Sequence, residues 1–399
     1  MSAETEAAAA VPRFEVTGPL PTGITVLEAS AGTGKTFTIA GLAARYVAGG
    51  TPLRDLLIVT FTRNATSELR DRVRERLVSA EQGLADMLDG APPQLGDDLL
   101  ALLADAPDAE VERRRERLAA ALADFDAATI VTTHGFCQEV LEGLGVAGDL
   151  EPGVQLVDDV RDLVDEVVDD LYVRRFHGEA QAAFDRRQAG RVADAAVRSP
   201  TAPLEPAGLD DGSRPAMRRR LAEAVRRELE LRKRRLGVMT YDDLLTRLDA
   251  ALDGPRGPQI AARLRDRYAV VLVDEFQDTD PVQWDIMRRA FGEPGSTLVL
   301  IGDPKQAIYA FRGADVYAYL AARDAAATHA TLDVNWRSDG PLIDAYDALF
   351  GRAQLGHPGI AYRPVSPAPA NRRARLAGAP QSAALRLRVV ARDTPGLST

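Results

Sequence analysis

A stretch near the N-terminus, Glu28-Ala-Ser-Ala-Gly-Thr-Gly-Lys-Thr36, has the residue types and spacing of a phosphate-binding loop. Its two glycines, Gly32 and Gly34, let backbone N–H groups turn towards phosphate oxygens, and Lys35 can reach the β and γ phosphates. The hydroxyl group of Thr36 can bind Mg²⁺. An apolar strand is expected at residues 24–27 and a helix from about residue 35, which is the context that this motif requires. The chemistry that these residues can perform is the binding of ATP with Mg²⁺.

The loop departs from the general pattern at one position, because Ala29 stands where that pattern has a glycine. A glycine-rich turn with a chance Lys-Thr pair is the alternative interpretation. Partner carboxylates far downstream, in the place that the loop predicts, favour phosphate binding. The loop residues predicted to bind ATP are Ala29, Ser30, Ala31, Gly32, Thr33, Gly34, Lys35 and Thr36.

The downstream carboxylates are Asp274 and Glu275, which directly follow the most hydrophobic expected strand, residues 268–273. An acidic pair at the tip of a buried strand fits the second half of a nucleotide-hydrolysing site. Asp274 would hold Mg²⁺, and Glu275 would orient and deprotonate the attacking water. The alternative, two helix-capping carboxylates, does not explain why so apolar a strand ends in this way. A further strand at residues 296–302 leads to Gln306, which is placed to sense the γ phosphate.

Aromatic side chains follow the same segment. Tyr309 and Phe311 lie beside Arg312, and their rings could stack on the bases of a nucleic acid. Both rings could instead belong to the core, and for Phe311 this alternative carries weight.

Polar residues follow two other expected strands. Thr62 and Asn64 come after the strand at 56–60 and could contact a phosphate backbone, although helix capping is favoured from this segment alone. His134 follows the strand at 128–132, at the edge where parallel sheets bind ligands, although a lone histidine is more often structural. Cys137 is expected to be a buried small residue rather than a reactive thiol.

Composition limits the classes of protein that this chain can belong to. At 399 residues with a net charge of −10 and a pI near 5.1, the chain does not coat nucleic acid through a general positive field, so any such contact is local. One cysteine excludes an internal disulfide framework and suits a reducing cytoplasm. The acidic, alanine-rich residues 1–13 are expected to form a disordered leader rather than a secretory signal. The apolar runs are too short to span a membrane, so we expect no membrane partner and a cytoplasmic location.

The order of expected strands and helices predicts an α/β fold with a parallel sheet and a helical insertion domain. The basic run at 214–235, in the last helix of the insertion, could follow a phosphate backbone or be a solvated helix with paired charges. The predicted divisions are an ATP-binding domain in two parts (14–144, with a helical insert at about 80–124, and 239–329), the helical insertion domain (145–238), and the start of a second domain (330–399).

Taken in order, six motifs resemble those of the UvrD-like superfamily 1 DNA helicases, over roughly residues 14–365. Within that family, the phosphate loop and the segment from Gly302 to Tyr309 look most like the RecB type. The motifs are the loop 29–36, Val59-Thr-Phe-Thr-Arg63, Thr133-His-Gly-Phe-Cys137, Asp274-Glu-Phe-Gln-Asp-Thr-Asp-Pro281, residues 302–315 and Asn335-Trp-Arg-Ser338. The resemblance implies a RecA-like P-loop fold, with residues 14–329 as the first motor domain and 330–399 as the start of the second. It also implies ATP-driven 3′ to 5′ movement on single-stranded DNA, unwinding of duplex ends in double-strand break repair and recombination, and RecC-like and RecD-like partner subunits.

Residue roles follow from the resemblance position by position. Gln306 would couple the nucleotide state to DNA, Arg337 would contact the γ phosphate, and Trp336 would stack on adenine. The implied catalytic set is Lys35, Asp274, Glu275, Gln306 and Arg337, and the implied DNA-binding set is Phe61, Thr62, Asn64, His134, Tyr309, Phe311 and Arg312.

The sequence also departs from the family. Many relatives carry a glutamine ahead of the phosphate loop, whereas this chain has Leu20-Pro-Thr-Gly23 there. The later helicase motifs and a nuclease domain are not found, so we expect an incomplete second motor domain. Two alternatives stay open: a chain that binds ATP and single-stranded DNA without productive unwinding, and a helicase-nuclease subunit of the related AddA type.

Overall fold

The computed structural model forms two compact units, described here separately. The first contains Met1–Thr133 and Pro258–Thr399, and the second contains His134–Gly257. The structure describes residues 11–92, 96–145, 154–178, 182–200, 202–208, 212–309, 314–351, 353, 355–376, 378 and 383–387.

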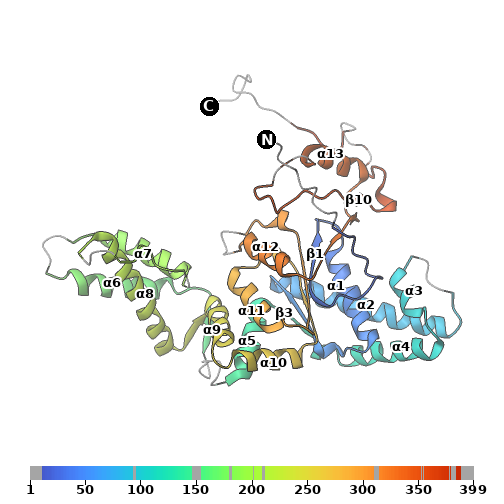
Figure 1. Cartoon of the computed structure of the whole chain (residues 1–399), viewed down its shortest axis with the longest axis horizontal. Helices are drawn as coiled ribbons and strands as arrows, with labels where there is room; N and C mark the ends of the chain where they lie inside the picture. Colours follow the sequence, from blue (N-terminus) through green and yellow to red (C-terminus); the bar gives the residue numbers. More distant parts are fainter. Residues whose placement is uncertain are drawn as a thin grey trace, which may run out of the picture. The chain divides into compact units, whose positions relative to one another are not determined.

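A parallel β-sheet is the centre of the first unit (Figure 1). Within the described residues it has six strands in the order β3-β2-β6-β7-β1-β8, and every neighbouring pair is parallel. The carboxyl ends of all six strands therefore meet at one edge. The strands are β1 (Gly23–Ala29), β2 (Leu56–Thr60), β3 (Thr129–Thr132), β6 (Val270–Val273), β7 (Thr297–Gly302) and β8 (Thr328–Leu332).

Helices cover both faces of this sheet (Figure 1). The helices α1, α2 and α4 lie on one side, and α11 and α12 lie on the other. The helices of this unit are α1 (Lys35–Gly49), α2 (Arg63–Leu88), α3 (Asp98–Ala104), α4 (Asp108–Ala123), α10 (Gly257–Arg267), α11 (Pro281–Phe291), α12 (Val316–Ala325) and α13 (Gly340–Phe350). Its short elements are η1 (Leu53–Asp55), η2 (Phe125–Ala127), η4 (Phe276–Asp278), η5 (Pro304–Gln306), η7 (Pro369–Asn371), β9 (Val334–Asn335) and β10 (Ser366–Pro367).

The strands are apolar on both faces because both faces are covered by helices. Successive side chains of a strand point to opposite faces, and in β1 Leu27 and Ala29 pack into the core formed with α1. Val26 and Glu28 consequently point to the other face. The same core receives Leu56, Ile58, Val270, Leu272, Val299 and Ile301 from the neighbouring strands.

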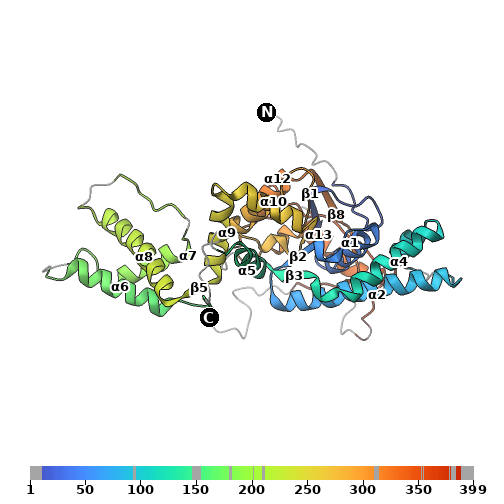
Figure 2. The same ribbon diagram turned by 90° about the horizontal axis from the view of Figure 1, so that it is seen from below.

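The second unit is mainly helical (Figure 2). Its core contains Val167, Val168 and Val225, all fully buried. Thr240 caps α9 through a reciprocal pair of hydrogen bonds with Asp243. The elements are α5 (Thr133–Leu144), α6 (Arg161–Phe176), α7 (Arg186–Arg198), α8 (Arg214–Leu236), α9 (Tyr241–Asp253), and the parallel pair β4 (Gln155–Val157) and β5 (Val238–Thr240).

The predicted α/β fold with a parallel sheet is confirmed, but two details differ from the sequence-based expectation. The compact second unit, 134–257, is wider than the predicted 145–238. The strand β8 was not predicted, and it crosses the predicted boundary after residue 329. Among the helices that the structure describes, none is both long and apolar enough to pass through a membrane.

Candidate nucleotide-binding site

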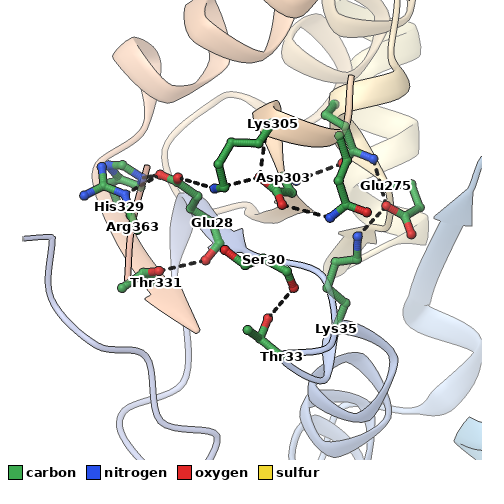
Figure 3. Close-up of polar contacts among 12 residues, drawn as sticks. Glu28, Ser30, Thr33, Lys35, Glu275, Asp303, Lys305, His329, Thr331 and Arg363 are labelled. Carbon is green, nitrogen blue, oxygen red and sulfur yellow. Dashed lines mark hydrogen bonds and ion pairs between the residues drawn. The ribbon is translucent and has the colours of Figure 1, made fainter. Parts of the chain in front are cut away.

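The phosphate loop connects β1 to α1 at the carboxyl edge of the sheet, as its sequence predicts. Gly32 and Gly34 have positive φ angles of 81° and 87°, which glycine adopts without steric cost. Gly34 is the N-cap of α1 and offers no side-chain acceptor, so the first backbone N–H groups of the helix remain available for an anion. Thr33 Oγ1 donates to the Ser30 carbonyl oxygen at 2.8 Å and closes the turn (Figure 3).

The departure at Ala29 has a structural explanation. Ala29 is the last residue of β1 rather than part of the turn, and its methyl group is fully buried in the core. A glycine is not required there, because the positive φ angles of the loop come later, at Gly32 and Gly34. The phosphate loop thus keeps its geometry although the sequence pattern is not strictly met.

Lys35 and Glu275 meet at this edge, as their predicted roles in one site require. Lys35 Nζ donates to Glu275 Oε2 at 2.6 Å, and the two side chains are 12% and 34% exposed (Figure 3). Glu275 has a left-handed backbone with φ 49° and ψ 40°. For a residue other than glycine this conformation costs on the order of 1 kcal/mol, and such strain is concentrated at functional sites.

Three carboxyl groups gather around Lys35. Burial, followed by the charge of Glu275, raises the pKa of Asp274 and of Asp278 to about 6, although Lys35 opposes the shift in both. Within the described part of the chain, Asp278 Oδ1 is buried without a hydrogen-bond donor. This excess of negative charge at a buried edge is a setting in which a divalent cation is stabilised.

Gln306 joins these residues through hydrogen bonds. Its Nε2 donates to Asp303 Oδ2 at 2.8 Å, and the Asp303 backbone N–H donates to Gln277 Oε1 at 2.9 Å. Gln277 Nε2 in turn donates to Glu275 Oε2 at 2.8 Å. Sequence reasoning assigned no role to Gln277. The available signal was an amide two residues after the acidic pair, and the structure shows that it is 2% exposed and connects two catalytic candidates.

The segment after β8 is hydrogen-bonded to the phosphate loop through Asn335. The sequence alone did not assign this residue to the site. Asn335 Nδ2 donates to the Ala31 carbonyl oxygen at 3.0 Å, and Trp336 N donates to the Gly32 carbonyl oxygen at 2.8 Å. A Cβ atom on Gly32 would lie 2.8 Å from Arg337 Cβ, so a glycine is needed for this close approach. The predicted residues Trp336 and Arg337 are therefore next to the loop.

An aromatic pair is exposed at the start of α1. Trp336 is 63% exposed and Phe37 is 58% exposed, and both are within 3.8 Å of the position that a Cβ of Gly34 would occupy. Sequence reasoning predicted Trp336 but missed Phe37, whose signal is a large apolar side chain immediately after the loop. Two exposed rings beside a phosphate site can stack on a nucleobase.

The residues predicted to bind DNA are only partly brought together. The rings of Phe61 and Tyr309 are stacked, with centroids 5.7 Å apart and planes at 27°. Thr62 Oγ1 accepts from Ala65 N at 3.1 Å and is the N-cap of α2, so the capping alternative is correct for Thr62, while Asn64 is exposed in the first turn. Phe311 and Arg312 lie outside the described residues.

His134 lies in the second unit, at the start of α5. Its ring contacts Tyr241 edge-on with centroids 5.7 Å apart. Burial lowers the pKa of His134, although the charge of Asp242 acts in the opposite direction. A predominantly neutral imidazole is therefore expected near pH 7.

Several basic side chains of helix α8 make hydrogen bonds or ion pairs within the second unit. Arg226 donates to the carbonyl oxygen of Ala196, in the last turn of α7, and to those of Ser199 and Ala202, which follow this helix. Lys233 contacts Asp243 at 2.6 Å and is 4% exposed. The alternative of a helix with paired charges thus accounts for much of this run, which includes the pair of Glu223 with Arg219.

Beside the phosphate loop lies a cluster of buried charges centred on Glu28 (Figure 3). Glu28 is 4% exposed, and its carboxylate oxygens lie 3.2 Å from Lys305 Nζ, 2.7 Å from Arg363 Nε and 3.4 Å from His329 Nε2. Burial by itself would raise the pKa of Glu28. The contacts with His329, Lys305 and Arg363 outweigh burial and hold the pKa at about 2, below its ordinary value of 4.5.

This low pKa predicts acid sensitivity. Because the pKa of Glu28 is lower in the folded chain, its ionisation stabilises the fold fully above pH 4.5, and this contribution is lost as the pH falls towards 2. The full contribution is on the order of 3 kcal/mol. We expect the difference in unfolding free energy between the wild type and Glu28→Gln, measured by urea denaturation, to shrink between pH 7 and pH 3. A difference independent of pH would contradict this assignment; Glu293→Gln, at an exposed position, is the control.

With this geometry established, comparison with known proteins identifies the family. The sequence profile of the UvrD/REP helicase N-terminal domain matches residues 14–327. The chain belongs to this family. The resemblance that the motifs predicted is thereby confirmed, and the matched residues of this helicase domain include the phosphate loop, the acidic pair and Gln306. Trp336 and Arg337 lie beyond the matched region.

Individual relatives point to one branch of the UvrD/REP family. The RecBCD enzyme subunit RecB of Mycolicibacterium smegmatis is 49% identical over 387 residues, covering 96% of this chain and 34% of the relative. RecB of Mycobacterium tuberculosis H37Rv is 48% identical over 388 residues, covering 96% of this chain and 35% of the relative. RecB of Escherichia coli K12 is 30% identical over 455 residues, covering 83% and 38%. This helicase domain therefore spans about a third of the length of these curated relatives.

Proposed function

We propose that this chain is the ATP-binding part of a RecB-type helicase that hydrolyses ATP to move 3′ to 5′ along single-stranded DNA. The observation that carries the proposal is the hydrogen-bonded set Lys35, Glu275, Gln277, Asp303 and Gln306 at one edge of the sheet. It connects a group for phosphate binding with a group for water activation and a group for nucleotide sensing. The proposed action is in double-strand break repair and recombination.

The residues fit ATP and Mg²⁺. The open N-terminus of α1 and Lys35 suit the phosphates, and Phe37 and Trp336 suit the adenine ring. Thr36 and Asp274 would hold Mg²⁺, which would neutralise charge on the β and γ phosphates. Among the described residues no group of three or more His, Cys, Asp or Glu side chains could hold a metal by itself.

The ion pair between Lys35 and Glu275 suggests an order of events. ATP binding draws Lys35 to the phosphates and releases Glu275 from its 2.6 Å contact. The freed carboxylate, already held in its left-handed conformation, accepts a proton from the attacking water. Gln306, at the end of η5, and Arg337, after β9, are proposed to contact the γ phosphate from two sides. Both side chains would lose this contact when the γ phosphate is released.

The stacked rings of Phe61 and Tyr309 are the proposed DNA contact. Both residues follow the carboxyl ends of strands, on loops next to the nucleotide site. We therefore propose that hydrolysis changes the affinity of these rings for bases. Asn64, Thr62, His134, Phe311 and Arg312 remain predicted DNA-binding residues. Duplex DNA ends and RecC-like and RecD-like subunits are the proposed partners, by analogy with the RecBCD enzyme named for the relatives.

The test is ATP turnover with and without single-stranded DNA. We expect DNA to stimulate turnover, and Phe61→Ala or Tyr309→Ala to raise the DNA concentration for half-maximal stimulation about 10-fold, because stacking on one base contributes about 1–3 kcal/mol. Tyr346→Ala is a matched control on α13, where the side chain is 39% exposed. Nucleotide binding without stimulated turnover would instead support a chain that binds ATP and DNA without productive unwinding.

A further inference from the structure

Glu28 occupies an unusual place for a carboxylate. It is the residue before the end of β1, next to the phosphate loop, and the alternation of the strand directs it away from the core that Leu27 and Ala29 enter. Its backbone carbonyl oxygen accepts from Thr331 Oγ1 at 3.0 Å, which fixes β1 against β8. No step of ATP binding or hydrolysis described above uses its side chain.

Apart from His329, the charged groups around Glu28 are the carboxylate of Asp303 and the two cations Lys305 and Arg363 (Figure 3). Lys305 Nζ lies 3.2 Å from Glu28 Oε1 and 2.7 Å from Asp303 Oδ1, so one ammonium group is shared between two carboxylates. Arg363 Nε binds the other oxygen of Glu28 at 2.7 Å. Arg363 alone could balance a buried Glu28, and Asp303 alone could balance Lys305. The shared ammonium group thus connects Glu28 to Asp303.

Lys305 occupies one oxygen of Asp303 and leaves the other for Gln306. Oδ1 of Asp303 accepts from the Lys305 backbone N–H at 3.1 Å and lies 2.7 Å from Lys305 Nζ, while Gln306 Nε2 donates to Oδ2 at 2.8 Å. Asp303 is 2% exposed, so its carboxylate has little freedom to find other donors. If Glu28 did not hold Lys305 from the other side, the ammonium group would be free to move onto both oxygens of Asp303 and compete with the Gln306 amide.

We propose that Glu28 is a positioning residue for ATP turnover, which acts through Lys305 and Asp303 to orient the Gln306 amide. This proposal rests on the proposed function, because Gln306 is its endpoint. The proposed mechanism assigns Glu28 no contact with the nucleotide or with the attacking water. Its loss should therefore lower the rate of turnover and leave the binding of ATP by the phosphate loop unchanged.

The experiment measures kcat and KM for ATP with saturating single-stranded DNA. We expect Glu28→Gln and Lys305→Met each to lower kcat about 10-fold with KM within twofold, because small displacements of a positioned group cost rate rather than binding. In a Gln306→Ala background, Glu28→Gln should have no further effect on kcat. The matched control is Asp97→Asn, which breaks a similarly buried ion pair with Arg76 away from the site and should lower the unfolding temperature without changing kcat.

The outcomes separate this proposal from the proposed function. Wild-type kcat in Glu28→Gln, or an equal loss of kcat with and without Gln306, would overturn the positioning role and leave the ATPase assignment standing. If Glu28→Gln does not fold, the same comparison of kcat is made for Lys305→Met in the wild-type and Gln306→Ala backgrounds. The same outcomes then support or overturn the positioning role. If the wild type hydrolyses ATP no faster than Lys35→Ala, the proposed function fails and the positioning role fails with it.

Discussion

Replacing Lys35 with alanine is expected to weaken ATP binding about 100-fold and to abolish measurable turnover. The ammonium group is the cation that the loop directs at phosphate, and a hydrogen bond to a charged group contributes about 1.5–3 kcal/mol. In the nucleotide-free chain the same substitution leaves Glu275 without its 2.6 Å partner, beside two further carboxyl groups. The measurement is a titration with a fluorescent ATP analogue, together with the rate of phosphate release.

Lys233 provides the matched control for Lys35. It is also a buried lysine with a 2.6 Å contact to a carboxylate, that of Asp243, but it belongs to the second unit. Lys233→Ala should destabilise its own unit and leave the ATP affinity unchanged. If Lys35→Ala bound the analogue as tightly as the wild type, the loop would not be the phosphate site.

The parts of this site that could be predicted from the sequence are those fixed by local patterns. The strand, the turn and the helix around Lys35 follow from an apolar run, two glycines and a Lys-Thr pair, and the structure places them within a few residues of the prediction. The strand β8 was missed because it is an edge strand with polar residues such as Thr328 and His329, so it lacks the continuous apolar run of its neighbours.

The parts that could not be predicted depend on contacts between distant positions. Glu28 meets Lys305 across 277 positions and Arg363 across 335, and no local pattern in either segment indicates the pairing. The left-handed backbone of Glu275 is likewise unexpected for a glutamate, since it is imposed by the contacts of Lys35, Asp274 and Gln277 rather than by its own preference. Tertiary structure thus adds the positioning of the groups whose chemistry the sequence already indicates.

Glu275→Gln is expected to have the opposite pattern to Lys35→Ala, in that ATP is still bound but turnover falls by about 100-fold to 10,000-fold. A glutamine has nearly the same shape as glutamate but cannot accept the proton of the attacking water, and general base catalysis contributes an effect of this size. The substitution also removes the anion that holds Lys35 at 2.6 Å. Lys35 is then free for phosphate before ATP arrives, so the affinity for ATP should be unchanged or higher.

The measurement that checks this is a paired determination of ATP affinity and single-turnover hydrolysis for Glu275→Gln, with the exposed Glu293→Gln as control. Tight binding with slow hydrolysis would assign water activation to Glu275. Weak binding with slow hydrolysis would instead mean that Glu275 supports the shape of the site, through Gln277 and its strained backbone. Hydrolysis at the wild-type rate would remove Glu275 from the catalytic set, and the carboxyl group of Asp278, which is buried on the same turn, would become the next candidate for the base.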